Sequence, residues 1–290
     1  MHLIEWGKKS LYAIIKEVVL MENIFTKKMP LYFRTEEAQL IQGDSFKMLT
    51  KIKPESVDMI FADPPYFLSN NGITCHSGKM VSVNKGSWDK LSESGTSIEE
   101  KHRFNRKWIK LCRKALRLNG TIWISGTLHN IYSIGMALEQ EGFKIINNIT
   151  WQKTNPPPNL GCRCFTHSTE TILWAKKNER KSRHFFDYQK MREINGGKQM
   201  KDVWTGSLTK LSEKAEGGHP TQKPEYLLEK IILASTKEGQ TILDPFCGSG
   251  TTGVVAVRYG RKFIGIDVNE EYLEMSKKRL EKITDDKKGF

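Results

Sequence analysis

Cysteine is scarce in this chain, with five among 290 residues. They are Cys75, Cys112, Cys162, Cys164 and Cys247. An odd and scattered set does not form the paired framework that is typical of small secreted proteins. Although Cys162 and Cys164 lie two positions apart, no second Cys or His pair with ligand spacing lies near them, so we expect no metal site. Reduced thiols, with no signal peptide and no lipidation motif, favour the cytoplasm.

Long apolar runs are also missing. The best candidate, residues 11–20, contains Lys16 and Glu17 and is shorter than the roughly 20 residues needed to cross a bilayer. Acidic residues are in deficit too, at 33 against 46 Lys and Arg, which gives a formal charge of +13. Because basic residues that bind phosphates release counterions, this deficit favours nucleic acid over a membrane surface as the partner.

A short stretch, Asp63-Pro64-Pro65-Tyr66, follows the apolar run 57–62, which has the composition of a buried strand. Two prolines fix φ and remove two backbone donors, so the strand must end there. In an open α/β sheet, ligands bind at the carboxyl ends of the strands. A carboxylate and carbonyls only accept hydrogen bonds, which suits an amino group, and the tyrosine offers a face for stacking a base. The alternative is a Pro-Pro turn with a packed tyrosine.

A second stretch, Asp244-Pro245-Phe246-Cys247-Gly248-Ser249-Gly250-Thr251-Thr252, follows the apolar run 241–243 and precedes a predicted helix at 252–259. Its glycines let the backbone turn sharply and approach a ligand closely. It lacks the third glycine of the dinucleotide fingerprint and the Gly-Lys of a phosphate-binding P-loop. A further predicted strand ends in Asp267, 19 residues beyond Gly248, where an acid can bind ribose hydroxyls. The alternative role of Asp267 is a helix N-cap.

Together with His219-Pro220-Thr221-Gln222-Lys223-Pro224, these stretches resemble the motifs of the DNA amino-methyltransferases, which transfer a methyl group from S-adenosylmethionine to an exocyclic amine. D-P-P-Y matches the catalytic motif of that family and D-P-F-x-G-S-G-T-T its cofactor loop. The catalytic motif comes first, as in the beta group, and the resemblance covers about residues 40–280. It is strongest to the second adenine methyltransferases of DpnII-type GATC restriction systems, through residues 61–69, 147–155 and 199–207.

The resemblance implies the roles of individual residues. The catalytic residues would be Asp63, Pro64, Pro65 and Tyr66. The residues that bind S-adenosylmethionine would be Asp44, Lys223, Asp244, Phe246, Gly248, Ser249, Gly250, Thr251 and Asp267. For Asp44, which ends a predicted strand at 38–44, a helix N-cap is an equal alternative.

Basic residues with interleaved aromatics are concentrated in residues 178–214, where the beta group places its target-recognition region. We predict DNA contacts from Trp151, Lys153, Asn155, Arg180, Lys181, Arg183, Lys201 and Trp204. The alternatives are a merely basic surface insertion and, for Trp151, core packing. The sequence leaves the oligomeric state open, with a homodimer as one alternative.

We predict a Rossmann-like α/β fold with a sheet of seven mostly parallel strands in permuted order. Residues 1–30 would be an N-terminal extension, with helical spacing at 11–19 and Met21 as an alternative start. Residues 31–290 would form one methyltransferase domain. Its parts would be a target-base half (38–177), a recognition insertion (178–218) and a cofactor half (219–284). We also expect an antiparallel hairpin from 144–153 and 166–175, and a structureless loop at 67–91 that covers the substrate.

The predicted activity is methylation of the N6 amine of adenine in DNA, within GATC and including single strands, as part of a restriction-modification system. Asp at position 63 favours adenine by resemblance. Methylation of the N4 amine of cytosine needs the same acceptors and is the main alternative. A DNA-binding protein that keeps this fold as a scaffold is the second alternative, against which the intact motifs argue.

Overall fold

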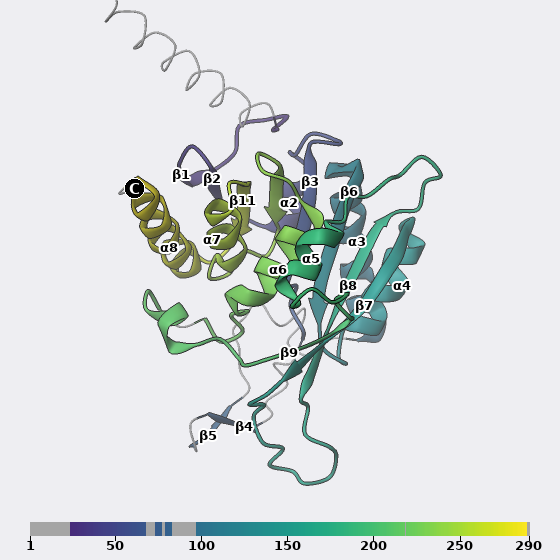
Figure 1. The fold of residues 1–290 in the computed structure, drawn as a ribbon, viewed down its shortest axis with the longest axis vertical. Coiled ribbons are helices and arrows are strands. Elements are labelled where there is room, and N and C mark those ends of the chain that lie inside the picture. The colour runs from purple at the N-terminus through teal and green to yellow at the C-terminus, as the bar shows by residue number, and fades with distance from the viewer. Residues whose placement is uncertain (1–23, 68–72, 77–78, 83–96, 218, 289–290) are drawn as a thin grey trace, which may run out of the picture.

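One large sheet forms the centre of the computed structural model, which describes residues 24–67, 73–76, 79–82, 97–217 and 219–288 (Figure 1). Its nine strands lie in the order β1-β2-β11-β10-β3-β6-β8-β7-β9. Their bounds are β1 (Leu31–Arg34), β2 (Ala38–Gln42), β3 (Val57–Ala62), β6 (Leu116–Gly126), β7 (Phe143–Lys153), β8 (Thr169–Lys177), β9 (Val203–Gly206), β10 (Thr241–Asp244) and β11 (Lys262–Asp267).

The predicted number of seven strands was therefore wrong by two, and both additional strands are short edge strands. β1 pairs antiparallel with β2, and β9 pairs parallel with β7. The seven strands between them match the expected sheet. Four-residue segments such as β1 and β9 have little periodicity of their own, and pairing with an existing edge makes them strands.

The middle of the sheet is parallel. β2, β11, β10, β3 and β6 all run in one direction, and β8 then runs antiparallel to β6 and to β7. Every residue of β3 is buried, as expected for a strand covered on both faces. The predicted hairpin is confirmed by β7 and β8. We call the edge where β3, β10 and β11 end the carboxyl edge, and the opposite edge the amino edge.

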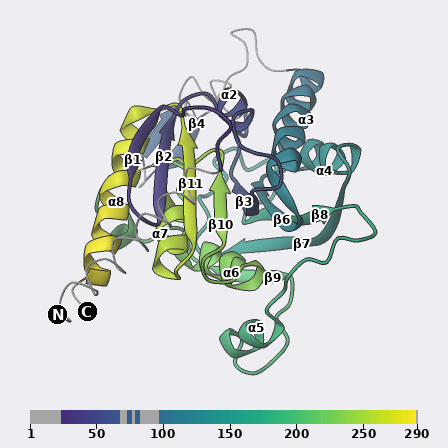
Figure 2. The same ribbon diagram turned by 90° about the horizontal axis from the view of Figure 1, so that it is seen from above.

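Helices cover both faces of the sheet (Figures 1 and 2). One face carries α2 (Ser45–Leu49), α3 (Ile98–Ala115) and α4 (Ile131–Gln140), and its core contains the fully buried Trp108. The other carries α6 (Glu225–Ser235), α7 (Thr251–Arg258) and α8 (Glu270–Lys288), with Phe263 in the core. The short α5 (Tyr188–Ile194) packs on α6, and η2 (Leu211–Lys214) is a 3₁₀ turn. None of the helices in the described residues is long and apolar enough to span a bilayer.

Neighbouring strands β3 and β10 continue into opposite layers, and this opens a crevice between them. The chain after β3 leads to α3 on one face, whereas the chain after β10 leads to α7 on the other. Ligands of doubly wound sheets bind at such a divergence, at the carboxyl edge. Both predicted motifs come directly after these two strands.

The predicted loop at 67–91 contains a two-stranded antiparallel hairpin, β4 (Ile73–His76) with β5 (Lys79–Ser82). The expectation that this segment lacks secondary structure was wrong for these eight residues. The remainder of the segment beyond Phe67, like the predicted helix at 11–19, lies outside the described residues.

Candidate active site

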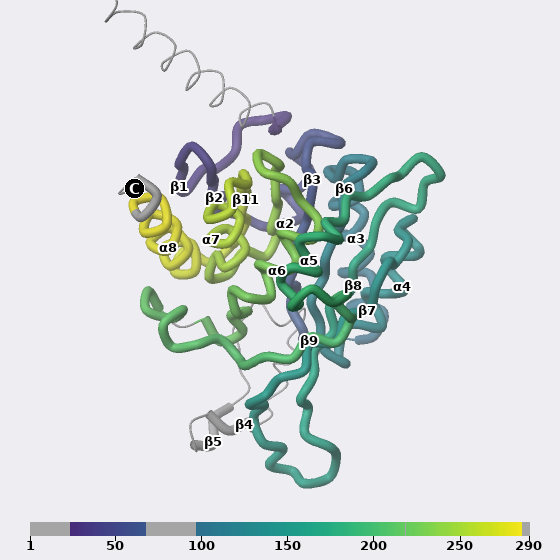
Figure 3. Tube along the Cα trace, viewed as in Figure 1, coloured from purple at the N-terminus to yellow at the C-terminus, as the bar shows by residue number. Residues whose placement is uncertain are grey.

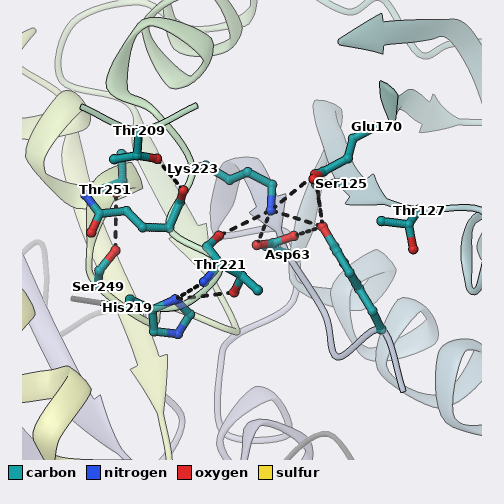
Figure 4. A network of polar contacts seen from close by, with 12 residues as sticks. Asp63, Ser125, Thr127, Glu170, Thr209, His219, Thr221, Lys223, Ser249 and Thr251 are labelled. Atoms are coloured by element: carbon teal, nitrogen blue, oxygen red, sulfur yellow. Dashed lines mark hydrogen bonds and ion pairs between the residues drawn. The ribbon is translucent and has the colours of Figure 1, made fainter. Parts of the chain in front are cut away.

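Asp63 follows the last residue of β3 and lies at the carboxyl edge. Its Oδ2 accepts a hydrogen bond from the Lys223 ammonium at 2.6 Å, and its Oδ1 accepts one from the Tyr66 hydroxyl at 2.5 Å. Lys223 comes from the H-P-T-Q-K-P segment that precedes α6. Two motifs 160 positions apart therefore meet at one carboxylate (Figure 4).

The hydroxyl of Tyr66 is held by several partners, which fixes the position of its ring. It lies 3.1 Å from Ser125 Oγ, at the end of β6, and accepts a hydrogen bond from Lys223 Nζ at 3.0 Å. Burial, together with the negative charge of Asp63, raises the pKa of Tyr66 well above its ordinary value. The phenol therefore keeps its proton and donates it to Asp63 rather than acting as a base.

A second carboxylate, Glu170, joins this network from the start of β8. Its Oε1 lies 2.7 Å from the Lys153 ammonium, and its Oε2 lies 3.5 Å from that of Lys223. Burial opposes ionisation of Glu170, but the two lysine charges outweigh it and lower its pKa. Burial likewise disfavours the charged form of Lys223, while Asp63, Tyr66 and Glu170 raise its pKa well above the usual value. Two carboxylates and two ammonium groups thus form a neutral, nearly buried cluster.

The glycine loop between β10 and α7 lies across the crevice from this cluster. Gly248 and Gly250 have φ values of +51° and +74°, in the left-handed region that favours glycine. A Cβ at Gly250 would lie 2.7 Å from Ser276 Oγ, and that hydroxyl donates to the carbonyl of Gly248 at 2.7 Å. The packing of α8 against the loop therefore requires glycine at 250.

Two acids hold the ends of this loop. Asp244 accepts from the Thr252 hydroxyl at 2.6 Å and from the Phe246 amide at 3.0 Å, and burial raises its pKa to about 7. Asp267 accepts from the Gly248 amide at 2.8 Å, and burial raises its pKa as well. Asp267 is not the N-cap of α8, because Asn269 Oδ1 accepts from the amide of Glu271 at 2.8 Å.

One cavity connects the two motifs. It encloses about 900 Å³ of space between atoms, part of it open to solvent. Its lining includes all four residues of the catalytic motif, together with Lys223, Asp244, Phe246, Gly248, Ser249, Thr251 and Asp267. A glycine cradle beside an acid at a strand end fits a ligand with a ribose and adenine, as in S-adenosylmethionine.

Asp44 and Gly250 are the predicted cofactor residues that do not line this cavity. Asp44 accepts from the Lys47 amide at 2.9 Å and is the N-cap of α2, while its contact with the cofactor stays a prediction. Its neighbour Ser45 does line the cavity and donates to the carbonyl of Pro245. Gly250 acts through the shape of the loop, as the N-cap residue of α7.

Trp151 and Trp204 lie in the hydrophobic core and, unlike the equally buried Tyr66, do not line the cavity, so the prediction that their rings contact DNA was wrong for this structure. They occupy paired positions on β7 and β9, and both side chains point into the layer under α6. Asn155 is exposed and its Oδ1 accepts from the Leu208 amide at 2.9 Å, so a DNA contact through its Nδ2 stays a prediction. Lys153 belongs to the active-site cluster through its ion pair with Glu170.

The basic residues Arg180, Lys181 and Arg183 lie at the amino edge, away from the cavity. β8 runs antiparallel to β6, so the chain passes along β8 from the carboxyl edge to the amino edge before it reaches these residues. The Arg183 amide donates to Asn119 Oδ1 at 2.8 Å, near the start of β6. Their contact with DNA stays a prediction, and it would lie at the edge of the sheet opposite the cavity. Lys201 is exposed just before β9, and its carbonyl accepts from Trp204 Nε1 at 2.9 Å.

Sequence reasoning did not identify Glu170 or Ser125. Each lies at a strand end of the carboxyl edge, but neither belongs to a motif. The available signal was an acidic residue at the start of the strand Thr169–Lys177, before its apolar stretch at residues 172–175. This acidic residue points to the active site only when β8 is known to begin at the carboxyl edge.

Comparison with known proteins agrees with this geometry. A family model described as DNA methylase matches residues 57–278. The chain is 71% identical over 251 residues to the type II methyltransferase M2.LlaDCHI of Lactococcus lactis subsp. cremoris, covering 87% of this chain and 92% of that protein. It is 70% identical over 250 residues to the type II methyltransferase M2.DpnII of Streptococcus pneumoniae, covering 86% and 92%.

Solved structures show the same fold. The M1.HpyAVI–SAM complex aligns with a TM-score of 0.61 and 28% identity, over 84% of this chain and 98% of that chain. The cytosine-N4-specific PvuII DNA methyltransferase aligns with a TM-score of 0.68 and 21% identity, over 90% and 94%, a likeness of fold alone. The chain belongs to the DNA methylase family and is a DNA methyltransferase that uses S-adenosylmethionine.

Proposed function

We propose that this enzyme methylates the N6 amine of adenine in DNA, within GATC and including single strands, as the methyltransferase of a restriction-modification system. The observation that carries the proposal is the Asp63 carboxylate beside the Lys223 ammonium, in one cavity with the glycine loop. GATC, the adenine base and the single strand rest on the resemblance to DpnII-type second methyltransferases and on the D-P-P-Y form of the catalytic motif.

The chemistry needs acceptors, because an amine on an aromatic ring is a weak nucleophile whose lone pair is delocalised. Asp63 and the carbonyl of Pro64 accept the two amine hydrogens and favour a pyramidal nitrogen with a free lone pair. S-adenosylmethionine, when bound, supplies the activated methyl group. The contribution of the chain is positioning and fixed electrostatics. Tyr66, fixed by its hydroxyl, provides the stacking face for the base.

The Asp63–Lys223 pair also matches one edge of the target base. A carboxylate accepts and an ammonium only donates, so side by side they complement an amino group next to an unprotonated ring nitrogen. Adenine presents this pattern at N6 and N1, and cytosine at N4 and N3, whereas guanine and thymine present a carbonyl beside a ring N–H. Although Lys223 and Tyr66 already bond Asp63, a carboxylate has about four acceptor sites and can take the amine as well.

A single strand suits this site physically. In a duplex the target amine is buried in a base pair, so the base must be flipped at a cost of a few kcal/mol. An unpaired adenine avoids that cost. We assign the exposed Arg180, Lys181, Arg183 and Lys201 to long-range attraction of DNA rather than to contacts at the target base. The enzyme would act in the cytoplasm, where bacterial DNA lies.

The test is methylation of matched oligonucleotides, single-stranded and duplex, with GATC or a scrambled site, followed by digestion to nucleosides. N6-methyladenine should appear in GATC strands of both forms. N4-methylcytosine would reject the adenine assignment, and equal N6-methyladenine in scrambled strands would reject the sequence assignment. Activity restricted to duplex DNA would reject the single-strand assignment alone.

A further inference from the structure

The loop of residues 154–168, between β7 and β8, projects from the carboxyl edge of the sheet (Figures 1 and 3). The Lys153–Glu170 ion pair closes its base, and Glu170 in turn approaches Lys223 at 3.5 Å. The loop is therefore anchored to the cluster that surrounds Asp63. Apart from this base, the proposed function gives the loop no role.

The tip of the loop carries a phenylalanine that none of the described residues covers. Phe165 is 96% exposed, the largest value among the large apolar side chains in the described residues. Leu160, on the same loop, is also exposed. Exposed apolar surface of this kind is unfavourable in water, so a partner that covers it gains free energy.

The tip is held in a defined shape rather than left extended. Pro156, Pro157 and Pro158 restrict the entry to the tip. Asn159 then closes it, donating from Nδ2 to the carbonyl of Cys164 at 2.6 Å and accepting from the Gly161 amide at 3.1 Å. A prearranged loop loses little conformational entropy when a partner binds.

Charge indicates which partner this is. Between Lys153 and Thr169 the loop has no acidic residue, and it carries Arg163 next to the Cys164–Phe165 pair. The whole chain has a formal charge of +13, so a second copy would bring a basic surface toward a basic loop. An aromatic ring with a neighbouring cation and no acid is the combination that stacks on the bases of single strands while contacting their phosphates.

We propose that Phe165 stacks on a nucleobase flanking the target, with Arg163 contacting the adjacent phosphate. The proposal rests on the proposed function, since it takes DNA as the substrate. The distance is suitable: the five residues from Phe165 to Glu170 span at most about 18 Å. With a rise of ~3.4 Å per stacked base, this reach covers the first few nucleotides beside the target.

The experiment places the fluorescent base 2-aminopurine at single positions on either side of the target adenine in a single-stranded GATC oligonucleotide. Stacking on an aromatic ring quenches its emission. Wild type should quench it at one or two flanking positions, and Phe165→Ala should remove that quenching and weaken binding at least about fivefold, the lower end of the effect of one base stack. Phe165→Trp should restore both. Tyr188→Ala, which removes a partly exposed aromatic on α5, is the matched control and should behave as wild type.

A Phe165→Ala variant with the wild-type quenching profile and affinity would overturn the proposal. So would a Phe165→Leu variant that performs as well as Phe165→Trp, because leucine packs but does not stack. If Phe165→Ala changed self-association in sedimentation and left DNA binding unchanged, the loop would be a protein contact instead. These readouts do not need turnover, so a wild type that binds DNA without methylating adenine would contradict only the proposed function.

Discussion

Strand β3 has an acid near each end, and the two acids have different surroundings. Asp58, toward the amino edge, accepts from the backbone amide of Thr241 at 2.9 Å and from the Arg117 guanidinium at 2.7 Å. Asp63, at the carboxyl edge, accepts from the side chains of Lys223 and Tyr66 beside an open cavity. Asp58 ties β3 to the start of β10, whereas Asp63 faces space that a substrate amine can enter.

The two edges also each hold a buried lysine. Lys177, at the end of β8, pairs with Glu55 at 3.1 Å and is 5% exposed, while Lys223 pairs with Asp63 at 2.6 Å and is 7% exposed. The burial of the lysine alone therefore does not separate the structural pair from the active-site pair. Strand direction separates the two pairs, because the helical layers diverge only at the carboxyl edge of the sheet.

The sharpest test of this difference compares Asp63→Ala with Asp58→Ala. Loss of an oriented electrostatic contact typically costs about 100-fold or more in rate, so Asp63→Ala should lose at least that much in kcat. Its affinity for S-adenosylmethionine should stay near that of wild type by calorimetry. Asp58→Ala should unfold more easily while keeping its activity per folded molecule. Equal losses of kcat in the two variants would show that Asp63 is no more important for catalysis than Asp58.

A pair of glycines extends the comparison to the cofactor loop. Gly250 and Gly196 both have positive φ, at +74° and +64°, so valine strains both positions by about 1–2 kcal/mol. Only at Gly250 would the new Cβ meet another group within 4 Å, the Ser276 hydroxyl. Calorimetry should show at least about tenfold weaker cofactor binding for Gly250→Val, the equivalent of 1.4 kcal/mol of loop distortion. Gly196→Val should bind normally, and normal binding by Gly250→Val would reject the loop assignment.

A change in the substrate distinguishes the role of Lys223 from that of Lys177. Replacing adenine by 1-deazaadenine removes the ring nitrogen that Lys223 would bond, and a hydrogen bond to a charged group is worth about 1.5–3 kcal/mol. Wild type should therefore prefer adenine by roughly tenfold or more in kcat/KM. Lys223→Met should lose the preference, and Lys177→Met should keep it. A preference that survives in Lys223→Met would place another donor opposite N1.

Burial of Asp244, at the carboxyl edge, predicts that the free energy of unfolding depends on pH. Its pKa rises from 3.8 to about 7 on folding, so the folded state binds this proton more tightly than the unfolded state. The contribution of this tighter proton binding to the stability of the fold is complete below pH 3.8 and is lost as the pH rises to about 7. Asp244→Asn removes this dependence. Relative to wild type, its free energy of unfolding in urea should increase by a few kcal/mol between pH 4 and 7. A difference that does not change with pH would show that Asp244 titrates normally.

The smallest effect is expected at the amino edge. Neutralising Arg180, Lys181 and Arg183 together to glutamine should slow association with DNA at low salt, as loss of long-range attraction does. The slope of log affinity against log salt should change by less than one unit. Three direct phosphate contacts on a single strand would instead remove about two units. A fall of that size, measured by titration at several salt concentrations, would show that DNA wraps to the amino edge.

Much of the active site was predictable because its elements are local. The prolines after Ala62 end β3, and the glycines after Cys247 permit a turn that other residues resist. These effects depend on a residue and its immediate neighbours. The two motifs, their order and the predicted parallel sheet between helical layers follow from such signals, and the structure confirms the sheet class.

The residues that were misplaced depend on pairing between distant segments. Trp204 was predicted as an aromatic within a basic region and Trp151 as a residue of the hairpin, and the pairing of β7 with β9 places both side chains in the core. Arg180 follows β8, which the sequence predicted as one arm of an antiparallel hairpin without fixing its direction relative to β6. The antiparallel direction of β8 sends Arg180 to the amino edge and, for the same reason, brings Glu170 to Asp63 and Lys223.

By itself, the sequence determined where the strands of the two motifs end, which chemical groups stand at those ends and that glycine must form the cofactor loop. Only the tertiary structure decided which other groups reach the same edge: Glu170, Lys153 and Ser125 in the cluster, and Phe165 on the loop beyond it. The reason is physical. Backbone conformation is restricted by each residue and its neighbours, whereas strand order and direction are set by burial and hydrogen bonding between segments far apart in the chain.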